Sequence, residues 1–454
     1  MGLLLASGSS KPTYPYDMWY GVKGSFSSKD YKLERVGNLD LHKTLPIQKK
    51  LKRYVENNLT GAVKYYLNAN DSRKKDGGAA AIIDSTDGNV MLEKPEYYLR
   101  VEIDVDSWIY AISEYPLPGF VKKEKRAIAP WFSTIDLTNN IAVSGCFLTW
   151  NGDEVARGEN GLPIFTTNAA QFRGGNGSSH ASWDDTYRSQ LGMARTNISK
   201  ATVRPLCKNG THHGAFRTFN EIAWLQRIEY ASLHSQDAYT TTLTIEGYHQ
   251  GGLGNGCTWN SSEWNSWASY YPFIPSGVTA PLGNNTGKVN FDVTLADGNK
   301  KTFQVTSYRG LEVPFEYLWM LADDVLIRTY PDTDKALTEA YLCEDYTKFT
   351  SPSDNATTVP NGYELIAELP RATDYILREQ ISKKGYAFPS AIGGSANTGW
   401  CDSFYSPGVA NSGWYGALLS AHAGDGACAG FGTLGADVRS SYTYATLGFR
   451  LCRD

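Results

Sequence analysis

The first part of the chain alternates between apolar and polar residues over short stretches. From residue 20 to about residue 120, such runs are broken by Gly, Asp and Asn, which is typical of strands joined by turns. Residues 98–105 (YLRVEIDV) alternate strictly and predict a half-buried strand. Residues 80–84 and 89–92 flank the turn dipeptide Asp87-Gly88 and predict a hairpin.

Three segments have a helical pattern. In the clearest one, Thr218 and Glu221 have the spacing of a capping box, with Thr218 as the N-cap. Apolar residues follow at helical spacing and are interpreted as core: Ile222, Leu225, Ile228 and Leu233. Residues 45–55 predict a short helix that begins at Pro46. Residues 373–383 predict another helix.

Residues 116–119 (PLPG) mark a predicted domain boundary. Beyond them, long loops rich in Gly, Asn and Ser occur at 173–182 and 251–266, and such loops are uncommon in compact domains unless they are functional. A length of 454 residues suits two or three domains. The sequence therefore predicts an α+β chain with an extended arm (1–19), a small β-rich domain for attachment or oligomerisation (20–120) and a second domain (121–454).

The C-terminal segment has a distinct composition. After Lys384 there is no Lys and no Glu, and Gly, Ala, Ser, Thr and Asn surround scattered aromatic residues. Rigid aromatic side chains among small polar residues are characteristic of antibody-like binding surfaces. The alternative is a Gly-rich β core, in which small residues let strands pack tightly.

Charge and length exclude some functions. The formal net charge is −4, the pI is about 6.0, and no basic block stands out, which argues against nucleic acid as a partner. No stretch reaches the ~18–20 apolar residues of a membrane span. Residues 1–10 are too short for a secretory signal, so we expect that the chain is not inserted into a membrane. We expect it to leave the cell inside an assembled particle that is released by lysis. The seven cysteines are widely spread without a CxxC pair, which predicts free thiols rather than disulfides or a zinc site.

Candidate catalytic and metal-binding patterns are few. His212-His213 has no third ligand at a recognisable spacing, and we interpret it as part of a solvated loop. Asp184-Asp185 and Asp323-Asp324 could bind calcium or take part in Asp–Arg capping networks. The sequence has no nucleophile elbow and no phosphate-binding loop in a strand–turn–helix context. A glycosidase carboxylate pair stays open, because its separation is spatial and not sequential.

Four segments, read in order, resemble the C-type-lectin-like fold shared by formylglycine-generating enzymes and the variable proteins of diversity-generating retroelements. They are RTFNEIAW (217–224), GLEVPFEYLW (310–319), GGS (393–395) and GFRLCR (448–453). Further segments resemble tail-fibre-like proteins of phages and prophages of gut Bacteroides relatives. They include LPIQ (45–48), SEYPLPGF (113–120), WDDTYR (183–188), EYASLHSQ (229–236) and EGYHQGGLG (246–254).

The resemblance implies a receptor-binding protein at the tail tip or tail fibre of a phage virion. Its partners would be a bacterial surface protein or glycan and other phage tail proteins, in a homo-oligomer for which a trimer is favoured. Residues 395–454 would form a variable ligand-binding segment, since adenine-directed mutagenesis of Asn-type codons never yields Lys or Glu. The expected ligand-binding residues are Asp402, Phe404, Tyr405, Trp414, Tyr415, His422, Asp425, Thr433, Asp437, Ser441, Tyr442 and Tyr444.

The same resemblance guides what we expect of chemistry and burial. The related enzymes need a redox-active cysteine pair, and the contexts of Cys401 and Cys428 do not match it, so we expect no catalysis, cofactor or bound transition metal. A formylglycine-generating-type oxidase, a glycan hydrolase and a purely structural tail component are the alternatives. Phe449 is expected in the core, and the aromatic residues of the tail are expected mostly exposed on one face, together with His422, Thr433 and Ser441.

Overall fold

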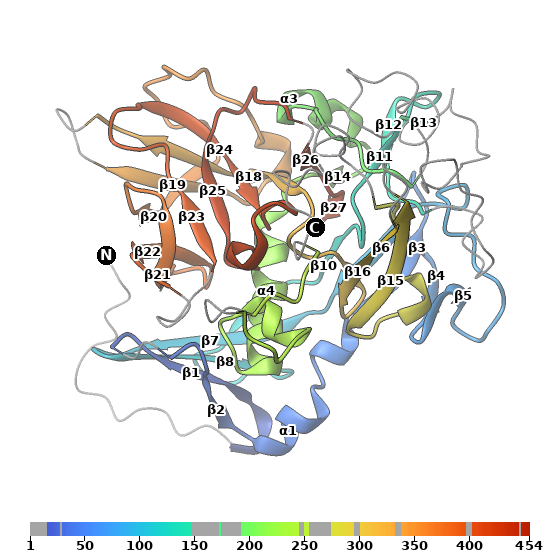
Figure 1. Cartoon of the computed structure of the whole chain (residues 1–454), viewed down its shortest axis with the longest axis horizontal. Coiled ribbons are helices and arrows are strands. Elements are labelled where there is room, and N and C mark those ends of the chain that lie inside the picture. The colour runs from blue at the N-terminus through green and yellow to red at the C-terminus, as the bar shows by residue number, and fades with distance from the viewer. Residues whose placement is uncertain are drawn as a thin grey trace.

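Strands dominate the architecture, and the predicted α+β chain is mostly β-sheet with few helices among the described residues (Figure 1). The computed structural model describes residues 16–27, 30–146, 172–173, 192–244, 249–253, 274–294, 300–331, 337–395, 402–444 and 446–454. Three α-helices are formed by the described residues: α1 (Leu39–Thr44), α3 (Lys200–Val203) and α4 (Phe216–Tyr230). None of the helices in these ranges is long and apolar enough to cross a membrane.

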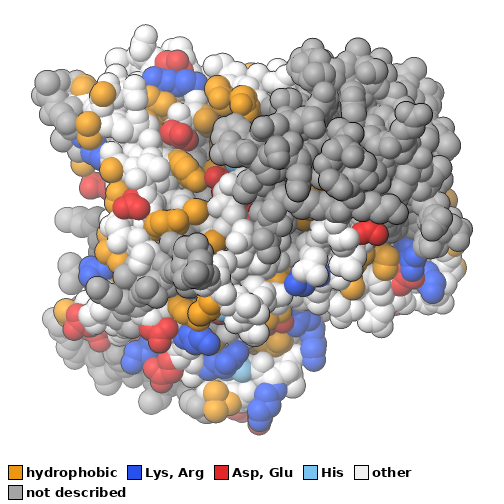
Figure 2. All heavy atoms as spheres, in the orientation of Figure 1, with side chains coloured by type: hydrophobic (Ala, Val, Ile, Leu, Met, Phe, Trp, Pro, Cys, Tyr) orange, Lys and Arg blue, Asp and Glu red, His pale blue; other side chains and the backbone are white. Residues whose placement is uncertain are grey.

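Two sheets are built mainly from the first 130 residues. A five-stranded sheet has the order β2 (Glu34–Gly37), β1 (Tyr20–Ser25), β8 (Ser107–Ser113), β7 (Tyr97–Ile103) and β9 (Val121–Lys123). A seven-stranded sheet has the order β14 (Thr211–His212), β27 (Cys452–Arg453), β10 (Arg126–Ile128), β6 (Val90–Lys94), β3 (Lys52–Glu56), β4 (Val63–Asn68) and β5 (Asp71–Lys75). Lys and Arg side chains gather over the lower part of the molecule, where the five-stranded sheet and α1 lie (Figure 2).

Three further sheets complete the fold. A nine-stranded sheet runs β20 (Tyr363–Leu369), β19 (Thr338–Cys343), β18 (Trp319–Thr329), β24 (Gly413–Leu419), β25 (Leu434–Val438), β23 (Ser403–Tyr405), β21 (Asp374–Ile381) and β22 (Ala387–Ile392), with β26 (Leu447–Gly448) paired to β18. One small sheet has the order β12 (Ile141–Val143), β11 (Thr134–Asp136) and β13 (Phe172–Arg173). The other has the order β15 (Gly287–Thr294), β16 (Lys300–Tyr308) and β17 (Leu311–Glu312).

Helix α4 lies at the centre of the molecule, and residues 216–228 are all buried (Figure 1). Its apolar side chains share one core cluster with Tyr110 of the five-stranded sheet and Met320 of the nine-stranded sheet. The helix is therefore packed between the two sheets, and the predicted apolar stripe does belong to the core. This burial on every side is the reason that the helix has only a weak amphipathic pattern.

The start of α4 differs from the prediction. Thr218 lies inside the helix, and the first two backbone N–H groups, of Phe216 and Arg217, donate to the carboxylate of Asp324 at 3.0 and 2.9 Å. Glu221 does not reach back to a cap but lies buried 2.6 Å from Lys94 and 2.9 Å from Arg126. Burial by itself would raise the pKa of Glu221. The positive charges of Lys94, Arg126 and Lys123 have a larger, opposite effect and lower the pKa to about 2. The capping-box prediction is therefore wrong.

Three other local predictions are wrong, and one is confirmed. The strictly alternating run forms β7, as predicted. Residues 45–55 form a 3-10 turn at Gln48–Lys50 followed by strand β3, and residues 374–381 form strand β21 instead of a helix. Strand β6 pairs with β3 and β10 and forms no hairpin with residues 80–84. In each case long-range pairing decided the local structure.

Strands from both sides of the predicted boundary near residue 120 share one sheet. Strand β27 pairs with β10 and β14, and Arg453 forms a two-point ion pair with Glu56 at 2.9 and 3.0 Å. The main core cluster likewise contains residues from Tyr20 to Cys452. The C-terminal strand therefore joins the first part of the chain to the last.

Candidate ligand-binding face

Three exposed loops meet at one end of the nine-stranded sheet. Residues 353–359 precede β20, residues 409–412 precede β24, and residues 441–444 follow β25. Strands β24 and β25 are antiparallel neighbours, so the start of β24 and the end of β25 lie at the same end of the sheet. We call these three loops together the loop face.

Trp414 fixes the first loop against the second. Its backbone N–H donates to the carbonyl oxygen of Asp354 at 3.1 Å, and its indole Nε1–H donates to that of Ala356 at 2.8 Å. Gly413 has a φ of +110°, and a Cβ atom at this position would lie 2.2 Å from the carbonyl oxygen of Asp354. Only glycine permits this close approach of the two loops without strain.

Arg439 links all three loops. Its Nη1 donates to the carbonyl oxygen of Trp414 at 3.0 Å, and its Nη2 donates to that of Ser412 at 2.9 Å. Its guanidinium also lies 3.9 Å from the centre of the Tyr415 ring and 3.5 Å from the carboxylate of Asp354. The opposite charges of Arg439 and Asp354 thus face each other.

The exposed side chains of the loop face are small, polar or aromatic apart from two valines, and they include no Lys and no Glu. Tyr442 and Tyr444 are 45% and 46% exposed, and their rings stack with centroids 6.1 Å apart. The carbonyl oxygen of Tyr444 accepts from the backbone N–H groups of Asn197 and Leu447. The other exposed residues are Ser353, Asp354, Asn355, Thr357, Thr358, Val359, Val409, Ala410, Asn411, Ser412, Ser441 and Thr443.

The structure places the predicted ligand-binding residues in different surroundings. Asp437, Ser441, Tyr442 and Tyr444 are exposed. The expected exposure of Phe404, Trp414, Tyr415 and Thr433 is wrong, because all four are buried, and Asp402 is buried with them. Trp414 packs in a core cluster with Tyr341 and Phe349, and Tyr415 belongs to the main core cluster, so the side chains on both faces of β24 are covered.

Tyr405, His422 and Asp425 form a half-buried cluster at the opposite end of β24. The Tyr405 hydroxyl donates to Asp425 at 3.0 Å, and the backbone N–H of His422 donates to the same carboxylate at 2.8 Å. The rings of Tyr405 and His422 meet Trp319 edge-on. These three residues are therefore brought together, but away from the loop face.

Asp402 and Thr433 belong to a buried turn. The carboxylate of Asp402 accepts from the Gly432 N–H at 2.7 Å, and the Thr433 hydroxyl donates to the carbonyl oxygen of Cys428 at 2.9 Å. Burial raises the pKa of Asp402 to about 7, against the lowering effect of Arg227. Phe449 is fully buried, as predicted.

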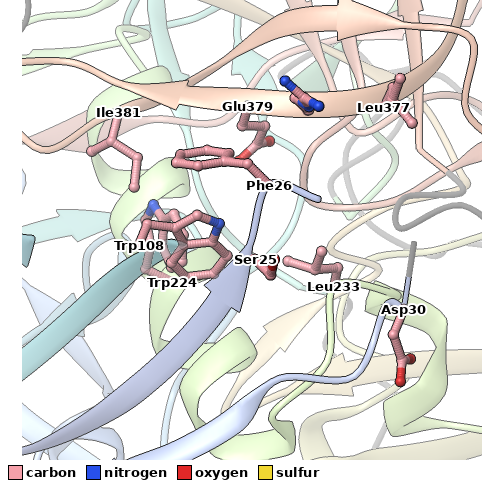
Figure 3. A pocket seen from close by; sticks show the side chains of 10 residues that line it. Ser25, Phe26, Asp30, Trp108, Trp224, Leu233, Leu377, Glu379 and Ile381 are labelled. Atoms are coloured by element: carbon pink, nitrogen blue, oxygen red, sulfur yellow. The ribbon is translucent and has the colours of Figure 1, made fainter. Parts of the chain in front are cut away.

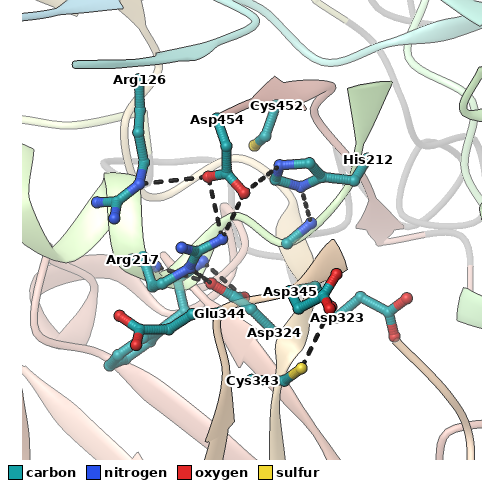
Figure 4. A network of polar contacts seen from close by, with 12 residues as sticks. Arg126, His212, Arg217, Asp323, Asp324, Cys343, Glu344, Asp345, Cys452 and Asp454 are labelled. Atoms are coloured by element: carbon teal, nitrogen blue, oxygen red, sulfur yellow. Dashed lines mark hydrogen bonds and ion pairs between the residues drawn. The ribbon is translucent and has the colours of Figure 1, made fainter. Parts of the chain in front are cut away.

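The His212-His213 pair is buried and not in a solvated loop, so that interpretation is wrong. Burial lowers the pKa of His213 to about 4. His212 lies 3.5 Å from Asp454, whose carboxylate also accepts from Arg217 at 2.9 and 3.0 Å (Figure 4). These residues form a structural network of charges.

The Asp323-Asp324 pair acts in capping and ion pairing. Asp324 caps α4, and Asp323 accepts two hydrogen bonds from Arg204, both at 2.8 Å. Among the described residues, no group of three His, Cys, Asp or Glu side chains could hold a metal ion. Asp184-Asp185 and Cys401 lie outside the described residues, and Cys428 is a half-buried free thiol.

One of the three loops, residues 353–359, lies outside the predicted ligand-binding segment 395–454 and was not foreseen from the sequence. Residues 351–362 (SPSDNATTVPNG) do carry the composition of a loop. Nothing local, however, indicates that this loop meets the start of β24. A search of protein-family models finds no match to the chain, and no curated protein matches it.

Proposed function

We propose that this chain is a receptor-binding protein that recognises a bacterial surface protein or glycan through the loop face. The carrying observation is that three exposed loops, without Lys or Glu, are held at one end of a sheet by Trp414 and Arg439. Binding residues are often placed on loops that a rigid scaffold positions. Tyr, Ser and Asn give contact area and adaptable hydrogen bonds at low entropic cost.

Within this proposal the chain acts at the tail tip or tail fibre of a phage virion, on a C-type-lectin-like scaffold. The sequence resemblance supports this setting. Other tail proteins are its partners, and it forms a homo-oligomer. Exposed apolar side chains at and beside β7 support an attachment role for the five-stranded sheet: Ile103, Val105 and Val121.

The experiment measures binding of the labelled, purified protein to a panel of Bacteroides strains. Tyr442→Ala and Tyr444→Ala remove the two largest exposed side chains of the loop face. A few aromatic residues carry most of the affinity of a typical interface, at ~2 kcal/mol or more each. We therefore expect each substitution to weaken binding by about 30-fold, because 1.4 kcal/mol corresponds to tenfold.

Tyr115→Ala is the matched control, because Tyr115 is 51% exposed and lies outside the nine-stranded sheet. It should leave binding unchanged, and all three variants should melt at the temperature of the parent protein. Equal binding by all variants would show that the loop face is not the binding face. Failure of the parent protein to bind any strain would argue instead for a structural tail component.

A further inference from the structure

Each of the three loops of the loop face carries an exposed apolar or aromatic side chain. Val359 is 41% exposed in the first loop, and Val409 is 50% exposed in the second. Tyr442 and Tyr444 of the third loop are exposed to a similar degree. Single exposed apolar residues are ordinary on a protein surface, but apolar side chains gathered on one face often mark an interaction site. The loop face therefore offers apolar contact area from all three loops.

The charged side chains of this region are used within the protein. Asp354 is the single charged residue of the three loops, and its carboxylate lies 3.5 Å from Nε of Arg439. The two Nη atoms of Arg439 donate to backbone carbonyl oxygens of the second loop and of β24. Arg328, half-buried beside the first loop, donates to the carbonyl oxygen of Thr357 at 2.8 Å. These side chains therefore hold the loops in place.

A carbohydrate and a protein surface demand different things of such a face. A neutral sugar presents hydroxyl groups, which are bound by a few fixed donors and acceptors such as carboxylate, amide and guanidinium groups. The central part of a protein–protein interface is depleted of charged residues and enriched in aromatic ones. The loop face has the second composition, because its exposed side chains include valines and tyrosines while its charged groups are engaged within the chain.

The hollow between the five-stranded sheet, α4 and β21 does not supply a sugar site instead. Figure 3 shows Phe26 between strand β21, which carries Glu379, and the indole rings of Trp108 and Trp224. The cavity that remains is about 30 Å³, which is about the volume of one water molecule in the liquid. This cavity is therefore too small for a pyranose ring.

We propose that the partner of the loop face is a folded protein on the bacterial surface, bound mainly through the exposed apolar and aromatic side chains of the three loops. That partner class rests on the proposed function and narrows it from a protein or glycan to a protein. Gly413, Trp414 and Arg439 fix the loops before binding. Little conformational entropy is therefore lost when a protein surface covers them.

The test uses intact cells of a Bacteroides strain that binds the labelled, purified chain. One portion is treated with proteinase K, which digests exposed proteins, and another with sodium periodate, which cleaves the vicinal diols of sugars. The protease should abolish saturable binding, and periodate should leave it unchanged. Binding that survives the protease, or that periodate abolishes, would overturn the protein partner while the receptor-binding function stands. Absence of binding to untreated cells of every strain would overturn both.

Substitution of the two valines tests the apolar contacts directly. Val359→Ser and Val409→Ser should each weaken binding about tenfold, the loss expected when a buried valine contact is removed. Val63→Ser is the matched control, because Val63 is 40% exposed on β4 of the seven-stranded sheet, and it should bind like the parent protein. All three variants should melt at the temperature of the parent protein, because these side chains are exposed. Equal binding by the two loop variants and the control would overturn the proposal.

Discussion

Asp402 is a buried carboxyl group whose titration should be visible in the stability of the whole chain. Its side chain is buried beside Arg227, Glu379 and Gly432. Burial raises its pKa from 3.8 to about 7, while Arg227 and the Gly432 N–H lower it and Glu379 raises it. A tenfold change in proton affinity corresponds to about 1.4 kcal/mol. The free energy of protonating Asp402 therefore differs between the folded and the unfolded chain by on the order of 4 kcal/mol.

The sign follows from which state holds the proton. Between pH ~4 and ~7 the folded chain keeps a proton on Asp402 that the unfolded chain has released. The free energy of unfolding therefore falls as the pH rises through this window, and the contribution levels off above it. Between pH 5 and pH 8 this one group should remove roughly 3 kcal/mol of stability.

Asp402→Asn isolates the effect, since asparagine has a similar shape and can still accept from Gly432. Urea unfolding at pH 5 and pH 8 gives, for the parent and for the variant, the change in the free energy of unfolding between these two pH values. The variant should lose less stability than the parent by roughly 3 kcal/mol over this range. Asp374→Asn, at an exposed position on β21, is the control and should follow the parent. Parallel pH dependence of parent and Asp402→Asn would refute the reasoning.

Three further substitutions test the scaffold. Phe449→Ala empties a fully buried position and should lower the free energy of unfolding by ~3–5 kcal/mol in urea titrations, whereas a loss below 1 kcal/mol would mean that the site collapses around alanine. Tyr415→Ala, at 4% exposure, should lower the melting temperature, while Tyr442→Ala at 45% exposure should change stability by no more than about 0.5 kcal/mol; equal melting temperatures would contradict the assigned burial. Asp324→Ala uncaps α4 and should cost ~1–2 kcal/mol or more, measured by circular dichroism melts; an unchanged melt would place the cap elsewhere.

Local patterns predicted what local interactions determine. The alternation of residues 98–105 identified β7, because side-chain periodicity reflects burial on one face of a strand. The apolar residues at helical spacing identified the body of α4, although that helix is buried on every side. The start of α4 could not be found in the same way. Its cap is Asp324, more than one hundred residues further along the chain, so no neighbouring residue carries the signal.

The errors in the tail have a related cause. The composition after Lys384 identified an unusual segment, but it could not tell which aromatic residues face solvent. That depends on what packs against the two faces of the sheet, where Trp414 and Tyr415 each join a core cluster. Residues 353–359 could not be assigned to the same surface, because contacts with residues distant in the sequence, Trp414, Arg439 and Arg328, bring them there.

The absence of Lys and Glu after Lys384 thus has two different physical origins. In β24 and β25, Trp414, Ala417, Leu418 and Ala436 are buried, and a long charged side chain there would lose its hydration. Packing alone accounts for the absence of Lys and Glu at those positions, so their composition is no evidence for binding. At residues 409–412 and 441–444 the side chains are exposed, and Lys or Glu would cost little. The proposed binding face therefore rests on these exposed loops, where burial does not account for the absence of Lys and Glu.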